Sequence, residues 1–333
     1  MYYQVEQVLE RQKTEIEKFY KGRGILICES GEGLYALKEY FGSAQKAEFL
    51  YWLGICLEQQ GVLCDSMLKN KDGNLITEGV DHVPYTFHHW LRGRECEIRN
   101  RIDLTVIVSF LARFHAACDG AEFDEIPEES EGGRKKDLCQ EYARHHTDLK
   151  HIRRFILKRN NKSDFEQLFL QCYEEFFRQS EEVTCYLERY PELGSGYTTG
   201  ICHGEMNQHN IILTNGGAAV IHLEHAHVGA QITDLGNLLR KILEKNEWNR
   251  QLGLDLIREY SRVHPLSRQD LRGLYYRLAY PEKFWKIASY YYRTRKVWDS
   301  GHNYEKLSRE ICQNQVRSQF LRALWEYCKR AHL

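Results

Sequence analysis

The sequence lacks the segments that would place it in or across a membrane. No apolar run approaches the roughly 18 residues that a bilayer-spanning helix needs. The first residues, MYYQVEQVLERQ, have no cationic start followed by an apolar core, so we expect no signal peptide. These two absences predict a cytoplasmic protein with no membrane partner.

Cysteine pairs with the spacing of metal or redox motifs are also missing. The 11 cysteines are an odd number and include no CxxC pair. We therefore expect reduced thiols that are buried in core segments. The segments concerned include those of Cys28, Cys56, Cys172 and Cys185.

An excess of charge of one sign is absent as well. The chain has 46 Lys and Arg residues against 47 Asp and Glu residues, a net charge of −1. This balance gives no indication of a nucleic-acid partner or of an anionic membrane surface. Hydrophobic residues make up 42% of the 333 residues, which is enough for the core of one large two-lobed unit or of two domains.

What the sequence does contain is a hairpin with polar ends, in residues 200–224. Two apolar runs, Ile211–Leu213 and Ala218–Leu223, flank the turn Asn215-Gly216-Gly217, which predicts two antiparallel strands. A carboxylate, an amide and a second carboxylate at a hairpin base are typical of phosphoryl-transfer enzymes, which use them to hold Mg²⁺ and to orient a hydroxyl. The polar residues at the open ends of this hairpin are His203, Glu205 and Asn210 on one side, and His222 and Glu224 on the other.

These residues carry a family resemblance. HGEMNQHN followed by VIHLE resembles the HGDxxxxN … IDF(D/E) pair of the aminoglycoside-phosphotransferase and choline-kinase-like superfamily. Three segments, GICHGEMNQHNII, QITDLGNLLRKILEKNEW and YRLAYPEKFWKIASYYY, are similar to the CotS-like kinase-fold proteins of bacterial spore coats, and the resemblance covers nearly the whole chain. It implies ATP as the cofactor, other spore coat proteins as partners, a spore coat location as the alternative to the cytoplasm, and a small-molecule substrate if the protein is active.

The fold that the resemblance implies is an α+β, protein-kinase-like (aminoglycoside-phosphotransferase-like) fold of two lobes. We expect a small β-rich N-lobe in residues 1–90 and a large helical C-lobe in residues 91–333. Residues 14–21 favour a helix by local propensity, whereas the kinase-like topology favours a first strand there. The expected strands are 25–29, 34–40 and 84–88, and the expected helices are 3–12, 43–60, 102–118, 134–159, 163–189, 249–263, 267–279, 281–296 and 303–330.

Carried over residue by residue, the superfamily motif makes Glu205 the catalytic base, after His203. Asn210 corresponds to a metal ligand and His222 to the main metal ligand. Glu205 is one methylene longer than the aspartate of the pattern, in a site where a misplacement of about 1 Å can cost about 100-fold in rate. The imidazole of His222 is a poor ligand for Mg²⁺, which prefers oxygen. Strong Mg²⁺ binding is therefore not expected.

A replacement for the lost carboxylate is Glu224. It follows His222 by two residues, so that alternation places both side chains on the same face of a strand. The alternative is that Glu224 is a solvated loop residue. Later in the chain, Asp234 has two alternative structural roles, because it could cap the helix that follows or accept the amide hydrogens of the His203-Gly204-Glu205 turn.

The N-lobe supplies the expected nucleotide site. Lys38, in LYALKEY, shares a strand face with Ala36 and Tyr40, and the resemblance implies that it contacts nucleotide phosphates. The alternative is a surface lysine on an edge strand. Glu48, in the second turn of the following helix, is the candidate partner of Lys38, and a solvated glutamate is the alternative.

Two further segments complete that site. Gly22 and Gly24 would allow a turn to approach a phosphate closely, although an ordinary hairpin explains the same pattern. The resemblance implies a hinge between lobes at Trp90 and Leu91, where an adenine would bond to the backbone. Trp90 is alternatively a core residue of the lobe interface. The aromatic residues of 275–298 favour helical core over a wall that binds a cationic substrate.

Two classes of function follow from these observations. The first is a pseudokinase-like structural or interaction protein that is associated with the spore coat. The second is a working ATP-dependent phosphotransferase that acts on a small-molecule or sugar hydroxyl. The altered residues Glu205 and His222 favour the first.

Overall fold

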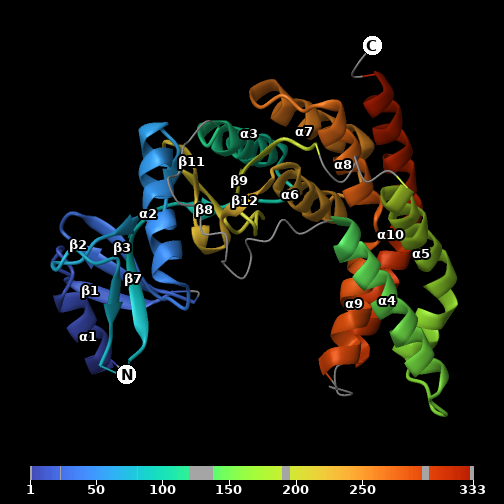
Figure 1. Cartoon of the computed structure of the whole chain (residues 1–333), viewed down its shortest axis with the longest axis horizontal. Helices are drawn as coiled ribbons and strands as arrows, with labels where there is room; N and C mark the ends of the chain where they lie inside the picture. The colour runs from blue at the N-terminus through green and yellow to red at the C-terminus, as the bar shows by residue number, and fades with distance from the viewer. Residues whose placement is uncertain are drawn as a thin grey trace. The chain divides into compact units, whose positions relative to one another are not determined.

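The computed structural model describes residues 2–22, 24–80, 82–119, 138–189, 196–294 and 300–330. Figure 1 shows the course of the elements along the chain. The helices are α1 (Tyr2–Glu10), α2 (Ala44–Gln59), α3 (Arg101–Ala117), α4 (Leu138–Leu157), α5 (Asp164–Arg189), α6 (Ile232–Lys245), α7 (Arg250–Val263), α8 (Arg268–Ala279), α9 (Glu282–Thr294) and α10 (Ser300–Arg330). The strands are β1 (Lys18–Lys21), β2 (Leu26–Ser30), β3 (Gly33–Glu39), β4 (Leu63–Cys64), β5 (Met67–Leu68), β6 (Ile76–Glu78), β7 (Pro84–Trp90), β8 (Arg94–Glu95), β9 (Thr199–Cys202), β10 (Ile211–Thr214), β11 (Gly217–Val220) and β12 (His227–Ala230). A 3₁₀ helix, η2, spans Leu223–His225.

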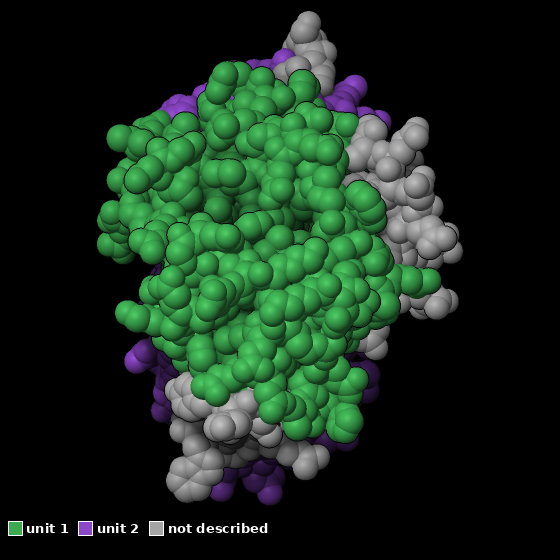
Figure 2. All heavy atoms as spheres, turned by 90° about the vertical axis from the view of Figure 1, so that its left-hand side faces the viewer, with its two compact units in different colours: residues 1–134, 200–238, 259–265 green, residues 135–199, 239–258, 266–333 purple. Residues whose placement is uncertain are grey.

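The chain forms two compact units, coloured green and purple in Figure 2. Unit 1 comprises residues 1–134, 200–238 and 259–265, and unit 2 comprises residues 135–199, 239–258 and 266–333. Unit 1 holds the sheets and the hairpin of residues 200–224, whereas unit 2 is built from helices. These elements confirm the α+β class. The division of lobes at residues 90 and 91 stays a prediction.

The main sheet of unit 1 is antiparallel and places β3 in its interior. The order of the strands is β1-β2-β3-β7-β5, and β6 also pairs with β7. β3 lies between β2 and β7, with Lys38 opposite Thr86. Lys38 is only 5% exposed, so the alternative of a surface lysine on an edge strand is wrong. α1 covers part of this sheet, where Val8 and Leu9 pack with Leu37 and Phe87.

Strand pairing determines the structure of residues 18–21, in the segment where local propensity favours a helix. Residues 18–21 form strand β1 because they pair with β2 in register, Lys18 opposite Glu29 and Lys21 opposite Leu26. Tertiary pairing of this kind routinely overrides local propensity. The topology implied by the resemblance is therefore confirmed at this point.

Helix α2 follows β3, and Ser43, the residue before the helix, caps its N-terminus. The Ser43 side chain accepts a hydrogen bond from the amide of Lys46 at 3.1 Å, which satisfies one of the free amides of the first turn. The helix buries Ala47, Leu50 and Leu57, whereas Ala44 in its first turn is exposed.

The hairpin of residues 200–224 forms as expected, but its second strand is shorter. β10 and β11 pair from Ile211–Val220 to Thr214–Gly217, which leaves Asn215 and Gly216 as the two-residue turn. β11 ends at Val220, and the chain then turns into η2. β4 adds to β11 in parallel, and β8 adds to β10, to give a four-stranded sheet.

Unit 2 is stabilised by stacked aromatic rings. Phe284 of α9 stacks on Phe169 and Phe176 of α5, with ring centroids 5.2 Å and 4.5 Å apart. The aromatic-core interpretation of residues 275–298 is confirmed for Phe284 and Tyr280, which are buried. Residues 295–298 lie outside the described residues. α5 begins with a capping box, in which the Ser163 amide donates to Glu166 at 2.9 Å and the Glu166 amide donates to Ser163.

The first residues of the predicted helix 134–159 lie outside the described residues, and so does most of the acidic segment 119–133 before it. All 11 cysteines are free; Cys28 and Cys172 are buried, but Cys185 is exposed, so the prediction of burial is wrong for Cys185. Among the described residues, no helix is both long enough and apolar enough to span a bilayer.

Candidate functional site

The first side of the site is the turn after β9, which buried groups hold in place. The Asp234 carboxylate accepts the backbone amide of His203 at 2.6 Å and that of Gly204 at 3.1 Å. Gly204 has a φ of 86°, and a Cβ there would lie 2.3 Å from the backbone oxygen of His225. The turn therefore requires glycine. Of the two roles predicted for Asp234, the one that accepts the turn's amides is confirmed.

Asp234 is itself fixed by a buried histidine. His115 of α3 contacts the Asp234 carboxylate at 3.3 Å through Nε2 and the Tyr260 hydroxyl at 2.6 Å through Nδ1. Burial alone would raise the pKa of Asp234, but His115 and the amide donors hold it below its usual range. The carboxylate is thus ionised and supports the turn from α6.

His203 has both ring nitrogens engaged by backbone. Nδ1 accepts the Glu205 amide at 3.2 Å, so Nε2 carries the proton and donates to the Ile221 carbonyl at 2.9 Å. Burial lowers the pKa of this histidine, which keeps the ring neutral. These contacts tie the turn to the end of β11 and favour a positioning role for His203 over proton transfer to a substrate.

Glu205 and Asn210 lie in the same loop, with different exposure. The Glu205 carboxylate is 59% exposed, and its Oε1 lies 3.7 Å from Nε2 of His225. Asn210 is buried, and its side-chain amide donates to the Glu205 carbonyl at 2.9 Å. The loop therefore presents one exposed carboxylate on a backbone that Asn210 holds.

The second side of the site is a buried ion triad around Lys38. The Lys38 ammonium lies 2.6 Å from Oδ2 of Asp65 and 2.5 Å from Oε1 of Glu224. The Asp65 side chain is 1% exposed and that of Glu224 is 31% exposed. Burial alone would lower the pKa of Lys38, but the two carboxylates raise it above its ordinary value. The predicted partner of Lys38 is therefore wrong: it is not Glu48.

Glu48 lies on the exposed side of α2, and sequence reasoning missed Asp65. A signal for Asp65 was available, because an aspartate stands between the apolar pairs of β4 and β5 in LCDSML. A lysine on a buried strand requires a buried counter-charge. Local spacing around Lys38 does not reveal that the lysine is buried, and without burial no such acid is required.

His222 stands where the superfamily pattern has its main metal ligand, and it adopts an unusual backbone. Its φ and ψ are 66° and 52°, a left-handed conformation that costs of order 1–3 kcal/mol for a residue other than glycine. The His222 amide donates to Asp65 at 2.9 Å, which compensates part of that cost. Its ring lies edge-on to Trp90, with centroids 6.1 Å apart.

Glu224 does not share a strand face with His222, because β11 ends at Val220 and Glu224 belongs to η2. That part of the prediction is wrong, although the two side chains do approach: Nδ1 of His222 lies 3.7 Å from Oε2 of Glu224. Burial alone would raise the pKa of Glu224, but His222 and Lys38 hold it well below its usual range. The reading of Glu224 as a solvated loop residue is also wrong.

Two more titratable groups adjoin the triad. The Lys46 ammonium of α2 donates to the Ala226 carbonyl, and burial lowers its pKa to about 8 despite the attraction of Glu224. The Nδ1–H of His88 donates to the Asp65 backbone carbonyl and its Nε2 accepts from the Thr86 hydroxyl, both at 2.9 Å, and burial together with Lys38 lowers the pKa of His88 to about 4. Oδ1 of Asp65 is buried and has no hydrogen-bond partner among the described residues.

The remaining predicted nucleotide-site residues lie in unit 1 as follows. Gly22 and Gly24 belong to the turn between β1 and β2, where the Gly22 amide donates to Ile25 O at 2.8 Å and Gly24 has a φ of 76°. Trp90 is the last residue of β7 and Leu91 follows it, both half-buried. Their roles toward a nucleotide stay predictions.

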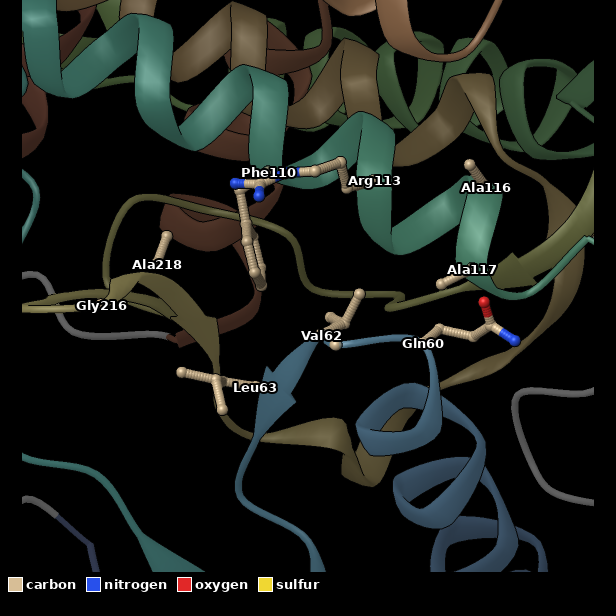
Figure 3. A pocket seen from close by; sticks show the side chains of 10 residues that line it. Gln60, Val62, Leu63, Phe110, Arg113, Ala116, Ala117, Gly216 and Ala218 are labelled. Carbon is tan, nitrogen blue, oxygen red and sulfur yellow. The ribbon is translucent and has the colours of Figure 1, made fainter.

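A cavity of about 290 Å³ lies on another part of unit 1, between the end of α2, α3 and the β10–β11 turn (Figure 3). It contains none of the residues predicted for the site. Its lining is formed by Gln60, Gly61, Val62, Leu63, Phe110, Arg113, Ala116, Ala117, Gly216 and Ala218. Among the described residues, no group of three or more His, Cys, Asp and Glu side chains is arranged to hold a metal ion.

The fold of the chain is that of a known class of solved structures. The chain is similar to a solved aminoglycoside phosphotransferase from Alicyclobacillus acidocaldarius subsp. acidocaldarius DSM 446, with a TM-score of 0.84 and 19% identity over 98% of this chain and 96% of that chain. It is also similar to spectinomycin phosphotransferase, solved with ADP and spectinomycin, with a TM-score of 0.65 and 13% identity over 96% and 97% of the two chains. The protein therefore has the kinase-like fold of aminoglycoside phosphotransferases, which confirms the predicted fold.

The family is narrower than that class. Residues 6–324 match the family described as "Spore coat putative kinase YutH", and the chain belongs to this family. Spore coat protein S of Bacillus subtilis (strain 168) is 23% identical over 323 residues, which are 93% of this chain and 89% of the relative. The resemblance to spore coat kinase-fold proteins is thereby confirmed.

The triad generates a prediction for stability. We expect Lys38→Met to lower the free energy of unfolding by about 3–5 kcal/mol, because it leaves Asp65 as a buried charge without its partner. Adding Asp65→Asn removes that charge and should recover a large part of the loss. Urea unfolding of the single and double variants measures both effects, with Glu48→Gln as a control that stays within about 0.5 kcal/mol of the wild type. A loss below about 1 kcal/mol for Lys38→Met would contradict the triad.

Lys46 generates a prediction for the pH dependence of stability. Its folded pKa of about 8 lies below its ordinary value of 10.5, so the unfolded chain binds the proton more tightly between these values. The contribution of Lys46 to the free energy of unfolding is therefore least favourable below pH 8, and it becomes more favourable as the pH rises to 10.5. Relative to Lys46→Met, the wild type should gain about 2.5 kcal/mol between pH 7 and pH 10. Chemical denaturation at several pH values measures this gap.

The matched control for this experiment is the exposed lysine Lys13. Lys13→Met should follow the wild type across the same range. A gap between the wild type and Lys46→Met that does not change with pH would show that the Lys46 ammonium is solvated.

Proposed function

We propose that this member of the family is a catalytically silent, pseudokinase-like protein that serves the spore coat in a structural or interaction role, with other coat proteins as its partners. The observation that carries the proposal is that the charge of Lys38 is already fully compensated within the chain. Two carboxylates already compensate its single charge, at 2.6 Å and 2.5 Å. An incoming nucleotide phosphate would find no uncompensated cation at this lysine.

The donor chemistry around the hairpin supports the same proposal. The residues present do not fit Mg²⁺ in the manner of the superfamily, because His222 offers nitrogen where the hard cation prefers carboxylate oxygen. Glu224, whose carboxylate approaches the His222 ring, is engaged by Lys38. We therefore infer that ATP binding, if retained, is weak and independent of Mg²⁺.

One observation favours the alternative, a working phosphotransferase that acts on a small-molecule or sugar hydroxyl. Glu205, at the position of the catalytic base, keeps a carboxylate that is 59% exposed. The loop that carries it is held by Asn210 and Asp234. In that case Glu224 would have to leave Lys38 when the nucleotide binds.

A nucleotide-binding experiment tests the role of Glu224. Glu224→Gln removes one of the two negative charges from Lys38, so it should tighten ATP binding without metal by about tenfold or more. Thermal-shift titration or calorimetry of the wild type and the variant, with and without Mg²⁺ or Mn²⁺, measures this change. Wild-type ATP binding that is tight and strictly dependent on Mg²⁺, and that Glu224→Gln abolishes, would instead make Glu224 a metal ligand.

A second experiment separates the two functions directly. We expect negligible ATP turnover by the wild type, and we expect Glu205→Asp combined with His222→Asp to restore Mg²⁺-dependent nucleotide binding. The reason is that the double change returns carboxylates to the base and metal positions of the superfamily pattern. Release of ADP or transfer of phosphate from labelled ATP provides the measurement. Turnover by the unmodified protein at about 1–100 s⁻¹, ordinary for kinases, would reject the pseudokinase proposal.

A further inference from the structure

The end of α4 in unit 2 carries a concentration of positive charge. From Leu149 to Ser163 the sequence LKHIRRFILKRNNKS contains six lysines and arginines and no acidic residue. The whole chain is nearly neutral, so this segment is a local exception. Arg154 and Lys158 are exposed, and neither pairs with a carboxylate among the residues that the structure describes.

Exposed aromatic and aliphatic side chains surround these charges. Phe155 of α4 is 44% exposed and lies edge-on to Tyr292 of α9, which is 43% exposed, with ring centroids 5.2 Å apart. Leu157 is 51% exposed. On the other flank of α9, which faces α10, the Lys306 ammonium lies 5.9 Å from the centre of the exposed Tyr290 ring. Figure 1 shows α4 and α9 side by side in this unit.

Five residues of α4 and α9 therefore form a basic–aromatic face: Arg154, Phe155, Leu157, Lys158 and Tyr292. We propose that this face docks an acidic segment of another protein. Exposed apolar groups gathered in one place mark interaction sites more often than scattered ones do. Tyrosine, phenylalanine and arginine are the residues that dominate the binding energy and composition of protein interfaces.

Charge complementarity requires a partner segment with negative charge. A segment with glutamates or aspartates would neutralise the uncompensated Arg154 and Lys158, and its apolar side chains would cover Phe155 and Leu157. Such steering by opposite charge accelerates association and selects the partner. The exposed side chain of Leu157 favours a protein segment over a nucleic acid, because it offers apolar contact area but no ring on which a base could stack. This inference does not depend on whether the phosphotransfer site is silent.

The test uses the full chain and a short synthetic peptide of glutamates with two phenylalanines as the probe. We expect the peptide to bind, and its affinity to fall as ionic strength rises. The double change Arg154→Glu with Lys158→Glu should weaken this binding about tenfold or more, because each attractive contact becomes repulsive. Phe155→Ser should also weaken it, with little effect on the salt dependence.

The matched control is Arg322→Glu with Arg330→Glu, which changes the charge by the same amount at exposed positions of α10. Arg322 lies 16 residues beyond Lys306, about 24 Å along the helix. The control should bind the peptide like the wild type, and all variants should keep the wild-type melting temperature within a few degrees.

Several results would overturn the proposal. Absence of peptide binding to the wild type would do so, as would equal binding by both double variants. A single-stranded oligonucleotide that binds this face more tightly than the peptide would make the partner a nucleic acid. Sedimentation that shows a wild-type dimer, lost in the Arg154→Glu and Lys158→Glu variant, would make the occupant a second copy of this chain.

Discussion

The burial of the Lys38 ammonium is the constraint on which the candidate site depends. A buried ammonium without partners costs several kcal/mol, so carboxylates must reach it from elsewhere in the chain. Asp65 does so from the β4–β5 connection and Glu224 from η2. Asp65 also accepts the His222 amide, and it therefore stabilises the left-handed residue that directs the chain from β11 into η2. One buried charge thus fixes three segments that are distant in the sequence.

A second buried carboxylate fixes the other end of the hairpin. Asp234 accepts two amides of the turn after β9, and His115 and Tyr260 orient it from behind. The backbone of the superfamily site is therefore held by residues that are not metal ligands. For this reason the site can keep its shape while its metal donors change. Fold and chemistry are separable here, and the chemistry of the candidate site depends on Lys38, His222 and Glu224.

The sequence predicted the fold and the hairpin well, because these depend on local pattern and on the family motif. The strands at 25–29 and 34–40, the helices, and the turn at Asn215 follow from apolar periodicity and turn residues, whereas β1 was favoured only by the kinase-like topology. The partner of Lys38 could not be read in the same way. The choice between Glu48 and Asp65 depends on which side of α2 faces the sheet and on how deeply β3 is buried, and neither is encoded in local spacing.

The position of Glu224 was missed for a related reason. Alternation along a strand holds only as far as the strand extends, and β11 ends at Val220 because the Asp65 carboxylate captures the next free amide, that of His222. The side chain of Glu224 still reaches its neighbourhood, but through a 3₁₀ turn and toward Lys38. Alternation therefore predicts that His222 and Glu224 lie close together, but it predicts neither the 3₁₀ turn nor the contact of Glu224 with Lys38.

Charge compensation differs between the candidate site of unit 1 and the proposed basic–aromatic face of unit 2. In the candidate site Lys38 is paired with both Asp65 and Glu224, and Glu224 also attracts Lys46. A site compensated in this way has little affinity left for an outside ion. In unit 2 the charges of Arg154 and Lys158 are exposed and are not compensated within the described residues. The net charge of −1 for the whole chain does not reveal this difference. An oppositely charged partner is attracted more strongly by the uncompensated charges of Arg154 and Lys158 than by charges that are already paired.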